Sequence, residues 1–151
     1  MSYVLKQADE RDIPHFITLG QHMHHESVYQ FLPFDRDIAE QTAQRYVNDE
    51  RSCAYLIMDN DQPLAMHLAS LTTYFFSPAL LAAGLVTYVR PKKRGSRAAL
   101  LLMRGFITWA KHHKADEVYM GVSAGISIER ADQFFKHFGF TFVGGNYKLR
   151  L

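Results

Sequence analysis

Several features are scarce or missing in this sequence of 151 residues. Cys53 is the only cysteine, so no internal disulfide can form, and a reducing compartment is favoured. The longest apolar run, residues 78–86, is too short to cross a bilayer as a helix. The first residues lack the layout of a signal peptide, and the chain has no low-complexity tract. These absences favour a single globular, cytoplasmic domain over residues 1–151.

Acidic residues are also unevenly distributed along the chain. Residues 1–61 contain eleven acidic and five Lys or Arg side chains, whereas residues 62–151 contain four acidic and twelve basic ones. From Arg90 to Ala115 there are eight Lys or Arg residues and no Asp or Glu. Such a segment favours a polyanionic ligand, and the acidic N-terminal half would suit a cationic one.

The same basic segment joins a predicted strand to a predicted helix. Leu85–Val89 is rich in β-branched and aromatic residues, which is typical of a strand, and apolar residues recur at helical spacing from Ala98 to Lys114. Between them lies a short loop with Pro91 near its start and Gly95 near its end. A strand that leads through a tight loop into a helix presents free backbone N–H groups. These groups and the helix dipole favour a bound anion, usually a phosphate.

The residues of this loop resemble a known pattern. Arg94-Gly95-Ser96-Arg97-Ala98-Ala99 is similar to the pyrophosphate-binding loop of the GNAT superfamily of N-acetyltransferases, whose pattern is Gln/Arg-x-x-Gly-x-Gly/Ala. Arg94 fits the first position and Ala99 the last. Arg97 stands where the middle glycine is usual, and its side chain would crowd a backbone that must approach a pyrophosphate closely.

The C-terminal third of the chain resembles a second GNAT signature, Ala-x-x-x-Tyr-x-x-x-Gly-Phe. A predicted helix over Ser127–Phe138 contains Ala131 and is followed by Gly139-Phe140, which match the pattern. Phe135 replaces the tyrosine. Because both signatures occur in the family's order, the resemblance covers nearly the whole chain.

The expected fold is α+β: the GNAT fold, with a central mixed sheet of six to seven strands flanked by about four helices. Helices are predicted to begin near residues 9–14 and 35–37, and to cover 98–114 and 127–138. Strands are predicted over 3–8, 53–58, 64–74, 81–89, 116–122, 140–143 and 147–151. The two strands on either side of the 98–114 helix should be parallel.

The resemblance also implies where acetyl-CoA would bind. The pantetheine arm would lie along the backbone of Thr87, Tyr88 and Val89, as an added strand does. Lys92, Lys93 or Arg97 could reach the adenosine phosphate, and the ring of Phe135 would lie near the thioester sulfur. The pyrophosphate would meet the backbone N–H groups of Arg94, Gly95, Ser96, Arg97, Ala98 and Ala99.

Acid–base groups are less firmly indicated. A base or a water chain must take the proton of the acceptor amine, and Glu26 is the first candidate, with His25 or His24 as the second. Phe135 has no proton to give the departing thiolate, so Tyr147, Tyr119 or Ser123 would have to replace the usual tyrosine. His22, His25 and Glu26 could share a helix face, but the spacing dictates no further ligand, and no metal site is expected.

The favoured function is therefore an acetyl-CoA-dependent N-acetyltransferase, with direct attack by an amine in a ternary complex. Arg97 and Phe135 motivate an alternative, a protein that binds acyl-CoA with little or no catalysis. A nucleic-acid-binding module is disfavoured, because the basic residues surround one phosphate-sized site rather than a long stripe with exposed aromatics. The acceptor stays open between a small metabolite, a drug amine, a protein N-terminus, a lysine and an aminoacyl-tRNA. The resemblance also suggests a homodimer and gives no reason to expect a membrane partner.

Overall fold

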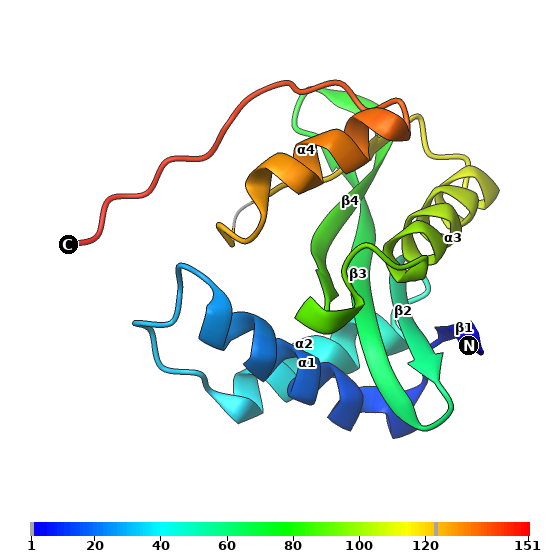
Figure 1. Cartoon of the computed structure of the whole chain (residues 1–151). Coiled ribbons are helices and arrows are strands. Elements are labelled where there is room, and N and C mark those ends of the chain that lie inside the picture. Colours follow the sequence, from blue (N-terminus) through cyan, green and yellow to red (C-terminus); the bar gives the residue numbers. More distant parts are fainter. Residues whose placement is uncertain (1, 123) are drawn as a thin grey trace.

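The computed structural model describes residues 2–122 and 124–151, and a five-stranded sheet lies at its centre (Figure 1). The strand order is β1-β2-β3-β4-β5. The first four strands are antiparallel to their neighbours, whereas β5 is parallel to β4, as the sequence predicted. The strands are β1 (Tyr3–Gln7), β2 (Ser52–Asp59), β3 (Gln62–Tyr74), β4 (Ser77–Val89) and β5 (Glu117–Tyr119).

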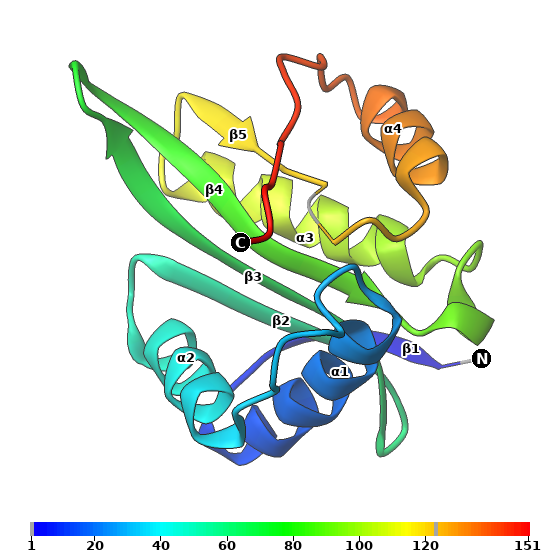
Figure 2. The same cartoon turned by 90° about the vertical axis from the view of Figure 1, so that its left-hand side faces the viewer.

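Helices cover both faces of this sheet (Figure 2). On one face, α1 (Ile13–Glu26) and α2 (Arg36–Asn48) contribute Phe16, Leu19 and Tyr46 to a core that includes Leu56 and Tyr88. On the other face, α3 (Ala98–His112) forms the crossover between β4 and β5, and α4 (Ile128–His137) packs its phenylalanines into the same core as α3. Two short 3₁₀ turns, η1 (Glu10–Asp12) and η2 (Pro91–Lys93), precede α1 and α3.

Local sequence explains why α1 begins where it does. Asp9 and Asp12 form a capping box around η1, the 3₁₀ turn that leads directly into α1: the Asp9 carboxylate accepts from the Arg11 N–H, and the Asp12 carboxylate accepts from the Asp9 N–H. The buried Asp12 carboxylate also accepts a hydrogen bond of 2.8 Å from Lys6. Pro14 follows at the first turn, where its missing N–H costs nothing. These contacts fix the start of α1. Its last turn, which contains Glu26, lies beside the end of β4.

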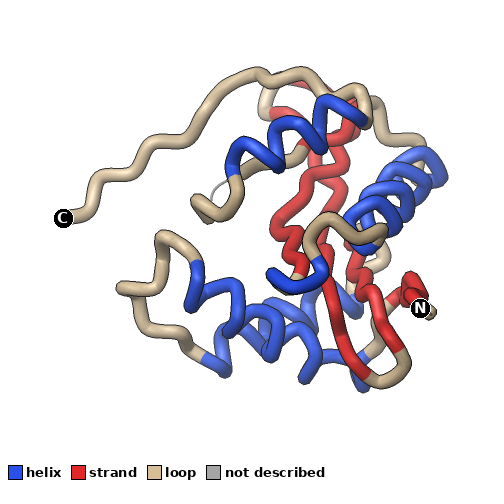
Figure 3. The backbone as a smooth tube through the Cα atoms, viewed as in Figure 1, coloured by secondary structure: helices blue, strands red, loops and turns tan. Residues whose placement is uncertain are grey.

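The sheet has fewer strands than the six to seven predicted. Residues 140–143 and 147–151, expected to close the sheet, form no strand, and every residue from Thr141 to Leu151 is exposed (Figure 3). Their alternating apolar pattern is compatible with a strand, but a strand needs a neighbouring edge to satisfy its backbone groups. This part of the chain instead extends from α4 to the loop between α1 and α2, where Lys148 and Arg150 lie over the rings of Tyr29 and Phe31. The prediction of two closing strands was therefore wrong for the single chain. The strand expected over 116–122 is also shorter, at three residues.

Candidate functional site

β4 has a neighbour on both sides along only part of its length. It pairs with β3 up to Val89, but with β5 only from Leu81 to Ala83. Along Gly84–Val89 no described strand lies on the β5 side. A register shift between Leu68 and Ala69 leaves Leu85 without a partner on β3, and such a bulge bends a strand. The backbone of this half of β4, including the predicted Thr87, Tyr88 and Val89, is therefore free on one edge to pair with an extended ligand.

The loop that follows β4 is tightly fixed. Arg90 Nε donates to the carbonyl of Pro63 at 2.7 Å, and Arg94 Nε donates to the carbonyl of Val89 at 3.0 Å. Gly95 has a φ of +83°, which only glycine adopts without strain. The hydroxyl of Ser96 accepts a hydrogen bond from the N–H of Ala98 at 3.3 Å. The next N–H groups of the first turn of α3 have no intrahelical acceptor, as at every helix N-terminus, and they remain available to an anion.

Arg97 departs from the glycine of the pattern without distorting this loop. Its φ of −74° and ψ of −1° are right-handed, so the backbone does not need a glycine here. Its side chain makes no capping hydrogen bond to α3 and the residue is exposed. The position that does need a glycine is Gly95, two residues earlier.

One basic residue of this region was not singled out by the sequence. A guanidinium nitrogen of Arg130, in the first turn of α4, would lie 3.4 Å from a Cβ built on Gly95. It adds positive charge to a loop that already contains Arg94 and two lysines. Sequence spacing could not identify Arg130, because α4 approaches the loop only after the chain has passed through α3 and β5.

The last turns of α1 face this loop. His22 and Glu26 are four residues apart and so share a face of the helix. His22 Nε2 lies 3.5 Å from Arg90 Nη1, and Glu26 forms an ion pair with Arg94. The Arg94 and Glu26 side chains are only 20% and 27% exposed, so water screens this pair less than an open surface pair. The predicted base and the predicted first residue of the anion loop are thus in direct contact.

Tyr88 completes this group. Its side chain is 4% exposed, and the Arg94 guanidinium carbon lies 5.5 Å from its ring centroid. Burial, followed by the negative charge of Glu26, raises the pKa of Tyr88 to about 12, with Arg94 and Arg90 opposing the shift. The phenol therefore keeps its proton at neutral pH. Among the described tyrosines, Tyr88 lies beside Glu26, and the predicted Tyr147 does not. Side chains alternate along a strand, so Tyr88 points to the opposite face from Thr87 and Val89, and this pattern could have indicated its position.

The other predicted acid–base residues lie elsewhere. His24 Nε2 lies 2.7 Å from the carbonyl oxygen of Leu32, so it fixes the loop after α1, and His25 is exposed. Tyr147 is 98% exposed in the C-terminal segment, residues 141–151, and Tyr119 lies on β5. Ser123 is outside the described residues. Phe135 belongs to the aromatic packing of α4, with its ring centroid 5.8 Å from Phe134 and 5.5 Å from Phe140.

A buried histidine lies behind the open half of β4. His67, on β3, is opposite Thr87, and its Nδ1 lies 2.7 Å from the Thr87 hydroxyl oxygen. The ring is 1% exposed, and its centroid lies 4.3 Å from that of Phe106 in α3. Desolvation lowers the pKa of His67 to about 3, so the ring is neutral near neutral pH. Its Nε2 has no hydrogen-bond partner among the described residues.

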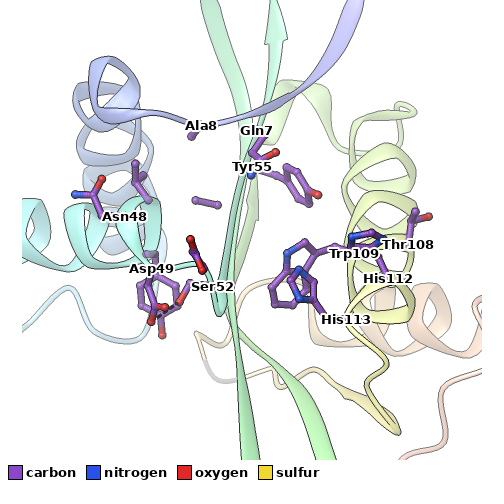
Figure 4. A pocket seen from close by; sticks show the side chains of 14 residues that line it. Gln7, Ala8, Asn48, Asp49, Ser52, Tyr55, Thr108, Trp109, His112 and His113 are labelled. Atoms are coloured by element: carbon purple, nitrogen blue, oxygen red, sulfur yellow. Dashed lines mark hydrogen bonds between the residues drawn. The ribbon is translucent and has the colours of Figure 1, made fainter.

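A separate hollow of about 570 Å³ opens at the start of β2 (Figure 4). β1 ends at Gln7, opposite Tyr55, so the start of β2 pairs with β3 alone, and the hollow forms between the ends of α2 and α3. Asp49, Trp109 and His113 are among its lining residues, and none of the predicted site residues is. In the described part of the chain, no three His, Cys, Asp or Glu side chains are grouped so as to hold a metal ion. No described helix has the length and apolar character needed to span a membrane.

No protein-family model matches the chain, and no curated protein matches its sequence. Solved structures, in contrast, match it along its length. The fold is that of the GNAT N-acetyltransferases, as the sequence predicted, with fewer strands in the single chain than expected.

Three of these structures illustrate the likeness. The aminoglycoside 6'-N-acetyltransferase AAC(6')-Ih from Acinetobacter baumannii superposes with a TM-score of 0.76 at 18% identity, over 99% of this chain and 98% of the other. AAC(6')-Iy, in complex with a bisubstrate analogue of CoA, gives 0.79 at 12% identity over 100% and 99%. A variant of the BH1408 protein from Bacillus halodurans gives 0.82 at 18% identity over 98% and 99%.

Proposed function

We propose that this chain is an acetyl-CoA-dependent N-acetyltransferase that transfers an acetyl group to an amine by direct attack. The observation that carries the proposal is that the half of β4 without a neighbour on the β5 side leads directly into the basic loop at the start of α3. This half of β4 offers backbone groups to an amide-containing arm, and the loop offers N–H groups and positive charge to a pyrophosphate. Acetyl-CoA contains such an arm joined to a pyrophosphate, so its two parts match these two features.

The residues present fit this co-substrate. Thr87, Tyr88 and Val89 would pair with the pantetheine arm through their backbone. The pyrophosphate would lie along Arg94 to Ala99, with Arg130 as an additional cation. The N–H groups of Arg94, Ser96 and Ala98 already donate within the loop, so those of Gly95, Arg97 and Ala99 would receive it. Lys92, Lys93 or the exposed Arg97 would meet the adenosine phosphate. Support comes from the fold shared with AAC(6') structures that contain CoA or a CoA analogue.

Glu26 is proposed as the base. In the reaction the neutral amine nitrogen attacks the thioester carbonyl carbon, a C–N bond forms, and the C–S bond breaks. One amine proton goes to the base, and the CoA thiolate takes up a proton. Glu26 is paired with Arg94, and a pyrophosphate that attracts the Arg94 guanidinium would release the carboxylate. Tyr88, which retains its proton, is the phenol placed to donate one nearby.

The direct test is release of free thiol from acetyl-CoA in the presence of a panel of amines. The panel should span the open acceptor classes: small polyamines, aminoglycosides, peptide N-termini, lysine peptides and aminoacyl-tRNA. We expect amine-dependent release with at least one class. Aminoglycosides belong in the panel because AAC(6') proteins of the same fold are named as aminoglycoside 6'-N-acetyltransferases.

Replacing Glu26 separates its catalytic role from its ion pair. A base typically contributes about 10²–10⁴ in rate, so Glu26→Gln should lower turnover by about 10² or more, most strongly at low pH. Coenzyme affinity should stay equal or increase, because Arg94 loses a competing carboxylate. Unchanged turnover from pH 6 to pH 9 would exclude Glu26 as the base. Glu129→Gln, in the first turn of α4, is the matched control.

A protein that binds acyl-CoA without catalysis is the second candidate. It is favoured by Phe135, which has no proton to donate, and by the exposure of Tyr147 to solvent. Binding of acetyl-CoA without thiol release for any amine would support it. We also propose a cytoplasmic location, in keeping with the free, buried Cys53, and a homodimer as the working form.

A further inference from the structure

The hollow of about 570 Å³ at the start of β2 is separate from the proposed acetyl-CoA site. It lies at the edge of the sheet where β1 ends, and both α2 and α3 end beside it (Figure 4). β3 lies between β2 and β4, and the open edge of β4 faces away from β3. The volume is in the range of pockets that bind small molecules. A molecule in this hollow would therefore occupy a second site.

Aromatic rings form one wall of the hollow. Figure 4 shows Tyr55, Trp109 and His113 on the α3 side of β2. The ring centroids of Trp109 and His113 are 4.7 Å apart, and Trp109 is only 9% exposed. A buried indole N–H usually has an acceptor, but that of Trp109 donates to no described residue. It is not among the fully enclosed polar atoms of the described chain, so it faces an opening.

The opposite wall, at the end of α2, is negatively charged. Asp49 and Glu50 line it, and no Lys or Arg is among the described lining residues. The Asp49 carboxylate is held in place, because it accepts from the Arg51 N–H at 2.9 Å and from the Ser52 hydroxyl at 3.4 Å. The last carbonyl groups of α2 and of α3 carry the negative ends of two helix dipoles. The field inside the hollow therefore favours a positive charge.

We propose that this hollow is a second ligand-binding site and that it takes a small organic cation with an apolar body, of the alkylammonium class. The aromatic wall attracts such a cation through its ring faces, and the carboxylates and helix ends attract its charge. The Trp109 N–H can donate to a hydroxyl or ether oxygen of the same ligand. An anion would be repelled by both carboxylates. The inference goes beyond the proposed acetyl transfer and does not depend on it.

The fluorescence of Trp109 tests this site directly, because it is the only tryptophan in the chain. Choline is a suitable probe: it has a quaternary ammonium, apolar methyl groups and a hydroxyl, and its nitrogen carries no hydrogen and so cannot accept an acetyl group. Choline in the millimolar range should change the fluorescence to saturation. Its uncharged isostere, 3,3-dimethylbutan-1-ol, should bind at least several times more weakly. No saturable change, or equal binding of the two compounds, would overturn the proposal.

Variants of the negative wall locate the cation. Asp49→Asn/Glu50→Gln keeps the shape of the wall and removes both charges, so choline should bind about fivefold more weakly or worse. The control, Asp59→Asn/Asp61→Asn, removes two carboxylates at the β2–β3 turn, and its affinity for choline should be unchanged. Equal losses in the two variants would mean that net charge attracts choline rather than the hollow, and would overturn the proposal.

A last titration separates this site from the acetyl-CoA site. Choline affinity should be the same with and without saturating acetyl-CoA, and the same in Arg94→Glu as in the wild type. Competition between choline and acetyl-CoA would place the probe in the coenzyme site and overturn the proposal. Thiol release measured on the same samples reports acetyl transfer separately, so either result can fail without the other.

Discussion

Two regions of this molecule have apolar sequences that predict strands, and their structural outcomes are opposite. β4 contains a continuous apolar run, and the C-terminal segment, residues 141–151, has apolar residues in alternation at its end. β4 is paired with β3 along its length and packed between α1 and α3, whereas the C-terminal segment pairs with no described strand and all its residues are exposed. The difference shows that an apolar pattern predicts a tendency to form a strand, whereas the neighbouring edge decides whether the strand forms.

The largest expected difference between these regions is in stability. Phe106 is completely buried between α3 and the sheet, and Phe106→Ala should lower the free energy of unfolding by about 3–5 kcal/mol. Phe142 is 71% exposed, and Phe142→Ala should change it by less than about 0.5 kcal/mol. Urea unfolding, at a concentration where the chain is monomeric, measures both. A Phe142→Ala cost as large as that of Phe106→Ala would mean that the segment packs on its own chain.

Charge reversal at the loop should give the next largest effect. Arg94→Glu removes a cation that lies at the end of β4 and places a negative charge at the proposed pyrophosphate site. Since a hydrogen bond to a charged group contributes about 1.5–3 kcal/mol, acetyl-CoA affinity should fall by about 100-fold. Calorimetry measures the change. Arg104→Glu, an exposed position further along α3, is the control and should bind normally. Equal losses in both variants would indicate that net charge matters rather than the loop.

Acid should weaken the packing behind β4 through His67. Its folded-state pKa of about 3 lies below the ordinary value of 6.5, so the unfolded chain binds the extra proton first as pH falls. The stability contributed by the neutral ring is therefore present above pH 6.5 and is lost progressively below it. The slope is about 1.4 kcal/mol per pH unit for one proton.

Denaturant unfolding between pH 7 and about pH 5 tests this dependence. His67→Gln should reduce the slope by about one proton, whereas His137→Gln, at an exposed position of α4, should leave it unchanged. Identical slopes in the wild type and His67→Gln would contradict a neutral, buried His67.

The smallest expected effect concerns Phe135. Its ring packs among the aromatic residues of α4, so Phe135→Tyr adds one hydroxyl group at a half-buried position. Acetyl-CoA affinity should change by less than about twofold, well below the effect of losing a charged hydrogen bond. Turnover should rise or stay the same, because the added phenol can supply a proton but the fold does not depend on it. A large loss of affinity would place Phe135 in a tighter contact with the coenzyme than proposed.

The sequence predicted most of this fold for identifiable physical reasons. Local signals were sufficient for α1, which follows the capped turn η1 and has Pro14 in its first turn, and for α3, whose apolar stripe is continuous. The β4–loop–α3 unit was predictable because its features are all close in sequence. The conformation of residues 141–151 was not, since a strand forms only where a sheet edge lies beside it, and the local sequence does not encode that edge.

The candidate site was predictable to a similar extent. The anion loop follows from Gly95 and its basic neighbours. The pairing of Glu26 with Arg94 and the approach of Arg130 to Gly95 join residues far apart in the chain, which no local pattern encodes. Tyr147 was expected near the cleft as one of three possible acids, and it is instead 98% exposed in a segment that forms no strand.

Hydrogen–deuterium exchange with and without saturating acetyl-CoA tests most directly where the coenzyme binds. An added β-like ligand and a bound pyrophosphate both protect backbone amides, so exchange should slow in peptides covering Leu85–Ala99. Peptides covering Asn48–Tyr55, which line the separate hollow, should exchange at an unchanged rate. Protection confined to Asn48–Tyr55, or none at Leu85–Ala99, would contradict the proposed acetyl-CoA site.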